Sequence, residues 1–392
     1  TNGKTSVVQF TSQILEDLGE KTGWITTISF KIGKRIIKNA TKMTVPNIWR
    51  TQKIMRDAAK SGCDYFLLEA TTHAIDQNRL WGISFSAVGL TNVTRDHLDY
   101  HKTFENYLNT KLKIFNQYIP AVINLDDENW KRFADKSDKT ILYSLSHNVI
   151  PSEVEESLRN YKGSLDSKLQ FLTRDDNMSA PNILGEFNQS NVLCAVGLLM
   201  ALGFNKEEIL PKLINLQPVR GRLELIDCGQ PYKIIIDYAH TPDAFEKLYA
   251  TIKTIKKQNA KIIHVFGATG DRDKGKRPML GKIAEQNANI IILTDEDPYS
   301  ENPGAIIAEI KSGISSNFKN LIIEIDREKA IEKALKMAQK DDIVLFTGKG
   351  HEEVMAVSDG SKHGFRLVPF NEKAIVAKLI KKKKLSLSGL TR

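Results

Sequence analysis

The chain opens with Thr1-Asn2-Gly3-Lys4-Thr5-Ser6, which reads as the second half of a phosphate-binding loop. A Gly-Lys-Thr triplet at the start of a helix surrounds a phosphate chain with backbone N–H groups, an ammonium group and a hydroxyl that can bind Mg²⁺. The alternative is an ordinary helix N-terminus capped by Thr1 or Asn2. Because the strand and first glycine of such a loop would precede Thr1, we expect the chain to be truncated at its N-terminus.

A helix and an acidic strand end follow this loop. Apolar residues recur at helical spacing from Val7 to Leu18, and Gly19 ends the pattern. The next clear strand, residues 64–69, carries the apolar run Tyr-Phe-Leu-Leu and delivers Glu69 at its carboxyl end. A buried parallel strand that ends in an acid beside a phosphate loop is a usual position for a Mg²⁺ ligand.

A polar cluster at residues 91–101 follows the next strand, residues 87–90, and is a site candidate. The predicted helix 103–115 carries Lys111 four residues from both Tyr107 and Phe115, where a lysine could simply snorkel to solvent. Strands are expected at 121–124 and 140–143, and residues 152–184 are hard to assign. Asn188 lies in the cap region of a helix that extends to about residue 202.

The pattern changes around residues 217–222, and we place the domain boundary there, giving domains 1–217 and 218–392. Beyond it, strands alternate with amphipathic stretches, as in a doubly wound parallel sheet. The expected strands are 233–236, 261–266, 289–293, 321–325 and 342–346. Since polar clusters follow four of them, we expect these clusters to gather on one edge of the sheet. The predicted fold class is therefore α/β, with a phosphate-loop domain on a mainly parallel sheet and a second, Rossmann-like domain.

The composition is that of a soluble globular protein, with 41% apolar and 26% charged residues among 392. Cys63, Cys194 and Cys228 form no C-x-x-C pair, which disfavours a disulfide framework or cysteine metal site and fits a reducing cytoplasm. The net charge of +9 would suit a polyanion, but lysines are scattered among acids except at 381–384. We expect anionic small substrates, no nucleic acid, no membrane span and a cytoplasmic monomer.

Nine short sequence motifs, in this order along the chain, resemble those of a known protein family. They are T-N-G-K-T, E-A-T-T-H-A-I-D-Q-N-R, T-N-V-T-R-D-H-L-D-Y-H, Y-L-N-T-K-L-K-I-F, G-E-F-N, G-R-L-E, D-Y-A-H-T-P-D-A, G-D-R-D-K-G-K-R-P and G-K-G-H-E. Together, over residues 1 to about 353, they resemble the Mur ligases, and most closely the members that add the third amino acid of the peptidoglycan stem peptide. The resemblance implies that the missing N-terminal part is a UDP-binding domain.

This resemblance implies an ATP-dependent amide ligase that takes UDP-N-acetylmuramoyl-dipeptide and a free amino acid. The acceptor carboxylate attacks the γ-phosphate to give an acyl phosphate, and the incoming amine displaces phosphate. Two cations would offset the repulsion between the two anions. By resemblance Lys4 reaches the β- and γ-phosphates, Thr5 and Glu69 hold one Mg²⁺, and His97 holds a second metal ion. Lys111 matches the lysine that the family carbamylates with CO₂, which turns a cation into a carboxylate near Mg²⁺.

The remaining site residues are implied by the same resemblance. Those for ATP are Gly3, Lys4, Thr5, Ser6, Asn188, Arg222, Asp237 and His240. Those for the UDP-muramoyl-peptide are Thr44, Thr71, Thr72, Gln77, Arg79 and Lys111. Those for the amino acid are Arg272, for its α-carboxylate, with Asp297, Tyr299, Gly348 and Glu352. Val45 stands where a second threonine is expected, so about 1 kcal/mol of hydrogen bonding is lost there or replaced elsewhere.

The clearest departure is in the amino-acid pocket. The family motif D-N-P-R marks enzymes that add meso-diaminopimelate, with its arginine on the distal carboxylate, whereas residues 296–299 here read Glu-Asp-Pro-Tyr. Two acids without the arginine predict a diamino acid that lacks the second carboxylate, such as L-lysine or ornithine. The alternatives are a diaminopimelate-adding enzyme, since 348–352 has the form common in those enzymes, a folylpolyglutamate synthase-like ligase, or a catalytically silent binding protein.

Overall fold

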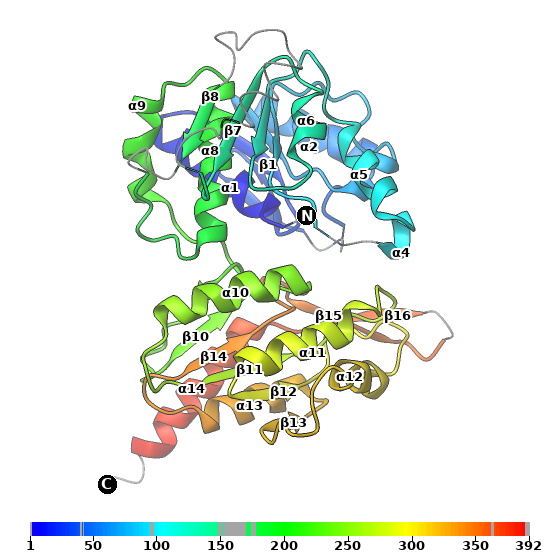
Figure 1. Cartoon of the computed structure of the whole chain (residues 1–392), viewed down its shortest axis with the longest axis vertical. Helices are drawn as coiled ribbons and strands as arrows, with labels where there is room; N and C mark the ends of the chain where they lie inside the picture. The colour runs from blue at the N-terminus through cyan, green and yellow to red at the C-terminus, as the bar shows by residue number, and fades with distance from the viewer. Residues whose placement is uncertain are drawn as a thin grey trace. The chain divides into compact units, whose positions relative to one another are not determined.

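The computed structural model describes residues 2–39, 41, 43–94, 98–147, 152, 170–173, 178–361 and 364–388, and the chain forms two compact units, Thr1–Gln217 and Pro218–Arg392 (Figure 1). Each unit has its own sheets and its own hydrophobic core. The α/β fold class expected from the sequence is confirmed.

The first unit contains two four-stranded sheets. One has the order β3-β2-β1-β4 and the other the order β5-β6-β7-β8, and the second sheet is parallel throughout. Their strands are β1 (Thr22–Ile25), β2 (Ser29–Ile32), β3 (Arg35–Lys38), β4 (Tyr65–Leu68), β5 (Val88–Leu90), β6 (Ala121–Asn124), β7 (Thr140–Ser144) and β8 (Gln170–Thr173). The helices are α1 (Lys4–Asp17), α2 (Ile48–Lys60), α3 (Thr72–Asp76), α4 (Leu98–His101), α5 (Phe104–Leu112), α6 (Trp130–Ala134), α8 (Glu186–Ala201), α9 (Lys206–Ile209) and the 3₁₀ helix η1 (Leu210–Asn215).

The antiparallel part of the first sheet is the main feature that sequence patterns missed. Strands β1, β2 and β3 form a meander, and β1 also pairs in parallel with β4. Each strand has only four residues, and β1 is buried along its whole length whereas β3 is mostly exposed. Neither strand shows the alternation by which a half-buried strand is recognised.

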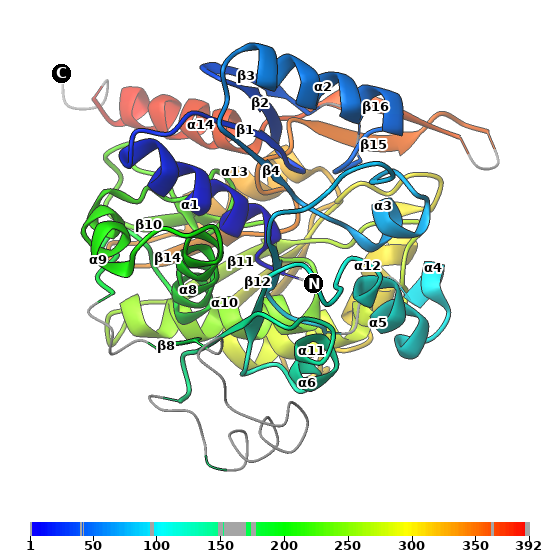
Figure 2. The ribbon, with the colours of Figure 1, turned by 90° about the horizontal axis from the view of Figure 1, so that it is seen from above.

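Helix α1, which carries the phosphate-loop residues, packs against α8 in the middle of the unit (Figure 2). Its inward face buries Phe10, Ile14 and Leu15 almost completely. Full burial of side chains of this size stabilises the unit by about 1.5–3 kcal/mol each. The middle and the last turn of α1 are therefore anchored in the core of the unit.

The second unit is built on a six-stranded sheet of order β13-β12-β11-β14-β10-β9, with only the edge strand β9 antiparallel. The strands are β9 (Glu224–Leu225), β10 (Lys233–Ile236), β11 (Ile262–Phe266), β12 (Ile290–Leu293), β13 (Leu321–Ile323) and β14 (Ile343–Phe346), and a separate hairpin is formed by β15 (Val354–Ser358) and β16 (Phe365–Pro369). The helices are α10 (Pro242–Ile255), α11 (Lys276–Asn287), α12 (Pro303–Lys311), α13 (Arg327–Met337) and α14 (Glu372–Ser388).

The central strands of this sheet are covered on both faces, which explains their continuous apolar sequences. Helices α10, α11 and α12 lie on one side of the sheet in Figure 1, and α13 and α14 on the other. Residues of β10, β11, β12 and β14 pack with α13 and α14 in one core. Because β12, β11, β14 and β10 are parallel neighbours, the polar segments after them share one edge of the sheet, as the sequence predicts.

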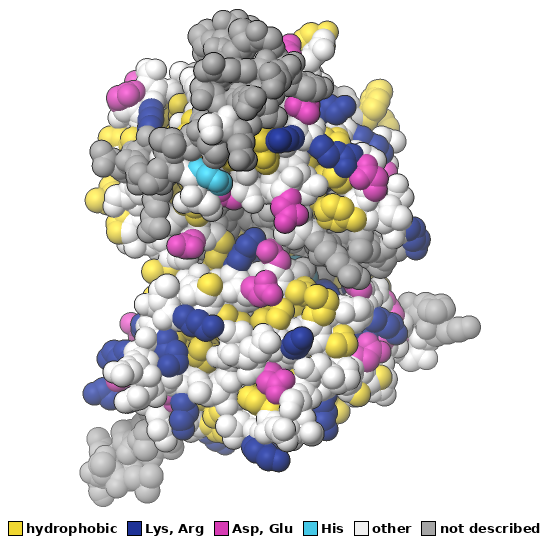
Figure 3. All heavy atoms as spheres, in the orientation of Figure 1, with side chains coloured by type: hydrophobic (Ala, Val, Ile, Leu, Met, Phe, Trp, Pro, Cys, Tyr) yellow, Lys and Arg dark blue, Asp and Glu magenta, His cyan; other side chains and the backbone are white. Residues whose placement is uncertain are grey.

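Two surface properties follow from the described residues. None of the helices in this part of the chain is long and apolar enough to cross a membrane. On the face drawn in Figure 3, Lys and Arg side chains are interspersed with Asp and Glu side chains in both units.

Candidate active site

The phosphate-loop residues form the start of α1. Gly3 precedes the helix with φ 87°, a left-handed conformation that glycine adopts without strain, and it contributes no side-chain cap to the first turn. A Cβ atom on Gly3 would overlap the side-chain amide of Asn191 in α8. Asn191 in turn donates to Asn188 Oδ1 over 3.2 Å. The backbone therefore approaches α8 closely at the helix end whose N–H groups and dipole favour an anion.

Thr5 and Glu69 are in direct contact, as the predicted metal site requires. The Thr5 hydroxyl donates to Glu69 Oε2 over 2.8 Å, and Glu69, at the carboxyl end of β4, is buried. Thr27 adds two donors, its N–H to Oε2 at 2.9 Å and its hydroxyl to Oε1 at 3.0 Å. Thr27 Oγ1 also lies 2.8 Å from the hydroxyl of Thr44, a predicted substrate residue. One hydrogen-bonded set thus joins the phosphate loop, the acid and a substrate residue.

Sequence analysis missed Thr27. It lies two residues beyond the end of β1, and β1 is the parallel neighbour of β4, so Thr27 and Glu69 follow strands that end at the same edge of the sheet. The pair Thr26-Thr27 at the end of a short apolar run was the available signal. Because the sequence patterns did not predict β1, they gave no reason to place these threonines near Glu69.

Lys111 is linked to the phosphate loop through Asn92. The Lys111 ammonium donates to the Asn92 carbonyl over 3.2 Å and lies 4.8 Å from the centre of the Tyr107 ring. The Asn92 side chain accepts from Asn2 N–H at 2.8 Å and donates to Asn2 O at 3.0 Å. Lys111 is therefore linked to Asn2, at the start of the loop, through one intermediate residue, Asn92.

The donor set fits a magnesium ion bound together with phosphates. Mg²⁺ is usually held by one or two protein oxygen ligands, with substrate phosphates and water completing an octahedron. The Thr5 hydroxyl and Glu69 carboxylate supply such a pair. Among the described residues no three His, Cys, Asp or Glu side chains converge as an all-protein metal cage. His97, the predicted ligand of a second ion, lies outside the described residues.

The other predicted substrate residues surround α3. Thr71 caps that helix, accepting from Ala74 N–H over 3.3 Å, while the buried Thr72 hydroxyl has no hydrogen-bond partner within the described chain. Arg79 donates to Gln77 and, over 2.8 Å, to the carbonyl of Val45. Val45 is fully buried in an apolar cluster. The Val45 carbonyl thus contacts Arg79, although Val45 lacks the hydroxyl of the threonine expected at this position.

Three of the predicted nucleotide residues lie in the second unit, and Asn188 lies in the first. The Arg222 guanidinium is 4.5 Å from the centre of the Tyr238 ring, and His240 Nδ1 lies 2.9 Å from the Tyr238 carbonyl. Asp237 accepts from Leu223 N–H at 2.5 Å and Ala239 N–H at 2.6 Å. Burial raises the pKa of Asp237, against the opposing effects of Arg222 and these two N–H groups.

The predicted amino-acid residues Asp297 and Glu352 are joined by Lys349. The Lys349 ammonium, fully buried, donates to Asp297 Oδ1 at 2.8 Å, Glu352 Oε2 at 2.7 Å and the Val354 carbonyl at 2.8 Å. Asp297 Oδ1 also accepts from Ala356 N–H at 2.7 Å. The sequence predicts an acidic pocket here, but Asp297 is not a free anion, because it shares the buried Lys349 cation with Glu352.

Glu296, the second acid of the motif, is held between two loops. It accepts from the Thr269 hydroxyl over 3.2 Å, and a Cβ atom on Gly348 would overlap its carboxylate. Burial raises the pKa of Glu296 to about 7, with Arg327 acting in the opposite direction. At neutral pH this side chain therefore carries only part of a negative charge, which further weakens the case for an acidic pocket.

Arg272 and Tyr299 are brought together by the structure. The Arg272 guanidinium lies 5.7 Å from the centre of the Tyr299 ring, and Phe365 of β16 packs edge-on against the same ring at 4.7 Å. Tyr299 N–H donates to the Ala356 carbonyl over 3.1 Å. The residue that replaces the motif arginine is thus fixed by the β15–β16 hairpin.

Both units match models of known protein domains. Residues 1–199 match the model of the Mur ligase middle domain, and residues 221–350 match that of the Mur ligase glutamate ligase domain. A solved UDP-N-acetylmuramoyl-L-alanyl-D-glutamate--2,6-diaminopimelate ligase is similar with a TM-score of 0.58 at 28% identity, covering 98% of this chain and 77% of that one.

Two curated relatives cover nearly the whole chain. The UDP-N-acetylmuramoyl-L-alanyl-D-glutamate--2,6-diaminopimelate ligase of Fusobacterium nucleatum is 35% identical over 98% of this chain and 77% of its own length. The UDP-N-acetylmuramyl-tripeptide synthetase of a Roseiflexus species is 36% identical over 95% of this chain and 76% of its own length. With both domain models and these relatives in agreement, the chain belongs to the Mur ligase family of ATP-dependent, amide-bond-forming ligases.

Proposed function

We propose that this protein joins a diamino acid to UDP-N-acetylmuramoyl-L-alanyl-D-glutamate at the expense of ATP, in peptidoglycan biosynthesis. The observation that carries the proposal is a pair of contacts made by the loop, Thr5 with Glu69 and Asn2 with Asn92, whose carbonyl accepts from Lys111. A helix cap without a nucleotide role would need neither a buried acid nor a lysine beside it. The names of the Fusobacterium and Roseiflexus relatives support the same substrate class.

In this proposal the first unit binds the phosphates and the muramoyl-peptide. Lys4 contacts the β- and γ-phosphates, and Thr5 and Glu69 hold Mg²⁺, which supplies charge neutralisation during phosphoryl transfer. His97 holds a second metal ion. Thr27 keeps the Glu69 carboxylate oriented through two hydrogen bonds. Thr44, Thr71, Thr72, Gln77 and Arg79 bind the muramoyl-peptide.

Lys111 acts as a carbamate in the same proposal. An ammonium group beside Mg²⁺ would repel it, whereas a carbamate adds a negative charge and two acceptor oxygens. Lys111 is half-buried beside the Tyr107 ring, and its amine is linked through Asn92 to the loop that we propose binds phosphate. Asn188, Arg222, Asp237 and His240 contact the nucleoside of ATP.

For the amino acid, meso-diaminopimelate is the first candidate. The Fusobacterium relative is named for it, and the ion pair of Asp297 with Lys349 weakens the physical argument for an amine-ended side chain. L-lysine is the second candidate because Tyr299 stands where the motif arginine would bind the distal carboxylate. Arg272 binds the α-carboxylate in either case, and Gly348 and Glu352 contact the rest of the amino acid.

The test is a coupled assay with the purified protein, ATP, Mg²⁺ and UDP-N-acetylmuramoyl-L-alanyl-D-glutamate. Phosphate release is measured with diaminopimelate, L-lysine and L-ornithine in turn, and the product mass is determined. We expect turnover with a diamino acid and a product heavier by that residue. Turnover only with a folate acceptor would assign the protein to another branch of the fold, and ATP binding without turnover would assign it to silent relatives.

Tyr299→Arg should shift the amino-acid preference towards diaminopimelate. An arginine at this position restores a bidentate donor for the distal carboxylate, an interaction that is strong because both partners are charged. We expect the ratio of kcat/KM for diaminopimelate over L-lysine to rise at least about tenfold. Ile323→Arg adds the same charge on an exposed strand position of the same unit and should leave the ratio unchanged. An unchanged ratio in Tyr299→Arg would mean that residue 299 does not face the distal group.

A further inference from the structure

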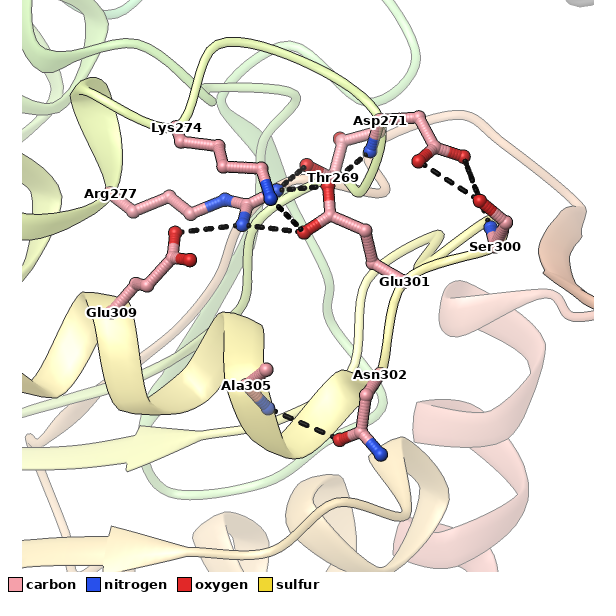
Figure 4. Close-up of polar contacts among 9 residues, drawn as sticks. All are labelled: Thr269, Asp271, Lys274, Arg277, Ser300, Glu301, Asn302, Ala305 and Glu309. Carbon is pink, nitrogen blue, oxygen red and sulfur yellow. Dashed lines mark hydrogen bonds and ion pairs between the residues drawn. The ribbon is translucent and has the colours of Figure 1, made fainter. Parts of the chain in front are cut away.

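A cluster of charged residues beside the amino-acid site holds two loops together (Figure 4). One loop, 267–275, connects β11 to α11 and contains Arg272, and the other, 294–302, connects β12 to α12 and contains Tyr299. Both loops leave the same edge of the sheet because β11 and β12 are parallel neighbours. Their relative position sets where the Arg272 guanidinium lies against the Tyr299 ring.

The two loops are tied by backbone and side-chain bonds. Gly270 N–H donates to the Asp297 carbonyl over 3.0 Å, and a Cβ atom on Gly270 would overlap the Pro298 carbonyl. Asp271, with φ 53°, accepts at its carboxylate from Ser300 N–H at 3.1 Å and from the Ser300 hydroxyl at 2.9 Å. The residue before Arg272 is therefore held by hydrogen bonds to the opposite loop.

Glu301 is the centre of this cluster. Its Oε1 accepts from Asp271 N–H at 2.6 Å and from one Arg277 nitrogen at 3.0 Å, and its Oε2 accepts from the other Arg277 nitrogen at 3.0 Å. Lys274 lies 3.1 Å from Oε2. The Arg277 hydrogen bond is the largest cause that lowers the pKa of Glu301 to about 2, so the group stays ionised throughout the working range of an enzyme assay.

Arg277 connects the cluster to the fold. Its guanidinium is fully buried, and besides Glu301 it donates to the Thr269 carbonyl at 3.1 Å and to Glu309 of α12 at 2.8 Å. It thus contacts the start of the Arg272 loop, the end of the Tyr299 loop and the helix that follows. A planar, bidentate guanidinium holds such partners in one geometry, which a flexible ammonium cannot do.

We infer that Glu301 and Arg277 are positioning residues that place Arg272 for binding of the incoming amino acid. This inference rests on the proposed function, in which Arg272 binds the α-carboxylate. Glu301 acts through the Asp271 N–H, one residue from Arg272, so loss of its charge releases the loop without removing any group that touches substrate. The amino-acid site then loses its preformed geometry while the nucleotide and muramoyl-peptide residues keep theirs.

The chain offers a matched control. Glu309 also pairs with Arg277, but within the described part of the chain it makes no hydrogen bond to the 267–275 loop, and its side chain is 38% exposed. Glu301→Gln and Glu309→Gln therefore each remove one carboxylate from the same arginine, and only the first also weakens the bond to Asp271. A purely structural role predicts similar effects of the two variants on activity.

The experiment measures KM for the amino acid, ATP and UDP-muramoyl-dipeptide separately in the purified protein. We expect Glu301→Gln to raise KM for the amino acid about tenfold, as for a weakened charge-assisted contact, with the other two KM values within about twofold. Glu309→Gln should leave all three within about twofold. In an Arg272→Lys background the effect of Glu301→Gln should shrink, because both changes act on the same contact.

Asp271→Asn gives a second route should Glu301→Gln fail to fold. Asparagine tolerates the left-handed backbone of residue 271 but has one acceptor oxygen fewer, so a rise of about threefold in amino-acid KM is expected. Equal effects of the Glu301 and Glu309 variants, or a full tenfold effect that persists beside Arg272→Lys, would overturn the inference. Absence of turnover in the unmodified protein with every diamino acid would instead overturn the proposed function.

Discussion

Lys111→Ala should reduce ligase turnover by about 100-fold or more, the range for loss of one preorganised electrostatic group in an active site. The reason is that the variant loses the carbamate that we propose beside Mg²⁺, while its fold is retained because Lys111 is only half-buried. Short carboxylates such as acetate should restore part of the lost rate by supplying the missing charge. Turnover is measured as phosphate release, with and without the added acid.

Lys113→Ala is the control for this prediction. Lys113 follows the same helix, but its ammonium is exposed and pairs with Asp76 at 3.2 Å, away from the phosphate loop. Its replacement should leave turnover within about twofold, as expected for a surface ion pair. Turnover of Lys111→Ala close to that of the unmodified protein would contradict the carbamate, as would equal rescue by chloride and acetate.

Lys349→Met should destabilise the second unit by about 3–5 kcal/mol, the range for breaking a buried ion pair from one side. The variant leaves Asp297 and Glu352 buried without their cation, and the Val354 carbonyl without its donor. The melting temperature of the unit should fall by about 10 °C. Calorimetry or circular dichroism on heating measures this shift.

The pH dependence of the same variant has a defined sign. Without Lys349, the folded variant holds two largely buried carboxylates with no cation beside them, and acid reduces this cost because protonation removes their charges. Its stability loss should therefore be largest at pH 8 and smaller at pH 5. Lys373→Met, which removes an exposed partner of Glu224, should cost less than about 1 kcal/mol at either pH. Equal losses in the two variants would show that Lys349 contributes no buried ion pair.

Sequence patterns predicted the central parallel strands well, because a strand that is buried on both faces has an unbroken apolar sequence. Strands β6 and β10 begin and end at the predicted residues, and β14 differs by one residue at its start. The meander β1–β3 and the hairpin β15–β16 were missed. Their strands are short and unevenly buried, so their own sequences carry no clear strand pattern. Their positions are set by the sheet or loop against which they pack.

The candidate site divides in the same way. Gly3, Lys4, Thr5, Glu69 and Lys111 could be found from the sequence, because a phosphate loop, an acid at a strand end and a family motif are local signals. Thr27 could not, since its role depends on the pairing of β1 with β4. The bridging position of Lys349 and the central position of Glu301 were also missed, because each joins segments that are far apart in the chain.

The sequence by itself determined the family, the two α/β domains and the residue types of a phosphate and metal site, because these depend on local pattern and composition. The surroundings of Asp297, in contrast, could be known only from the folded chain. Whether Asp297 acts as a free anion depends on what lies within 3 Å of it, and that is a lysine 52 positions along the chain. Electrostatic energy depends on distance in space and on burial, and neither quantity can be read from positions along a chain.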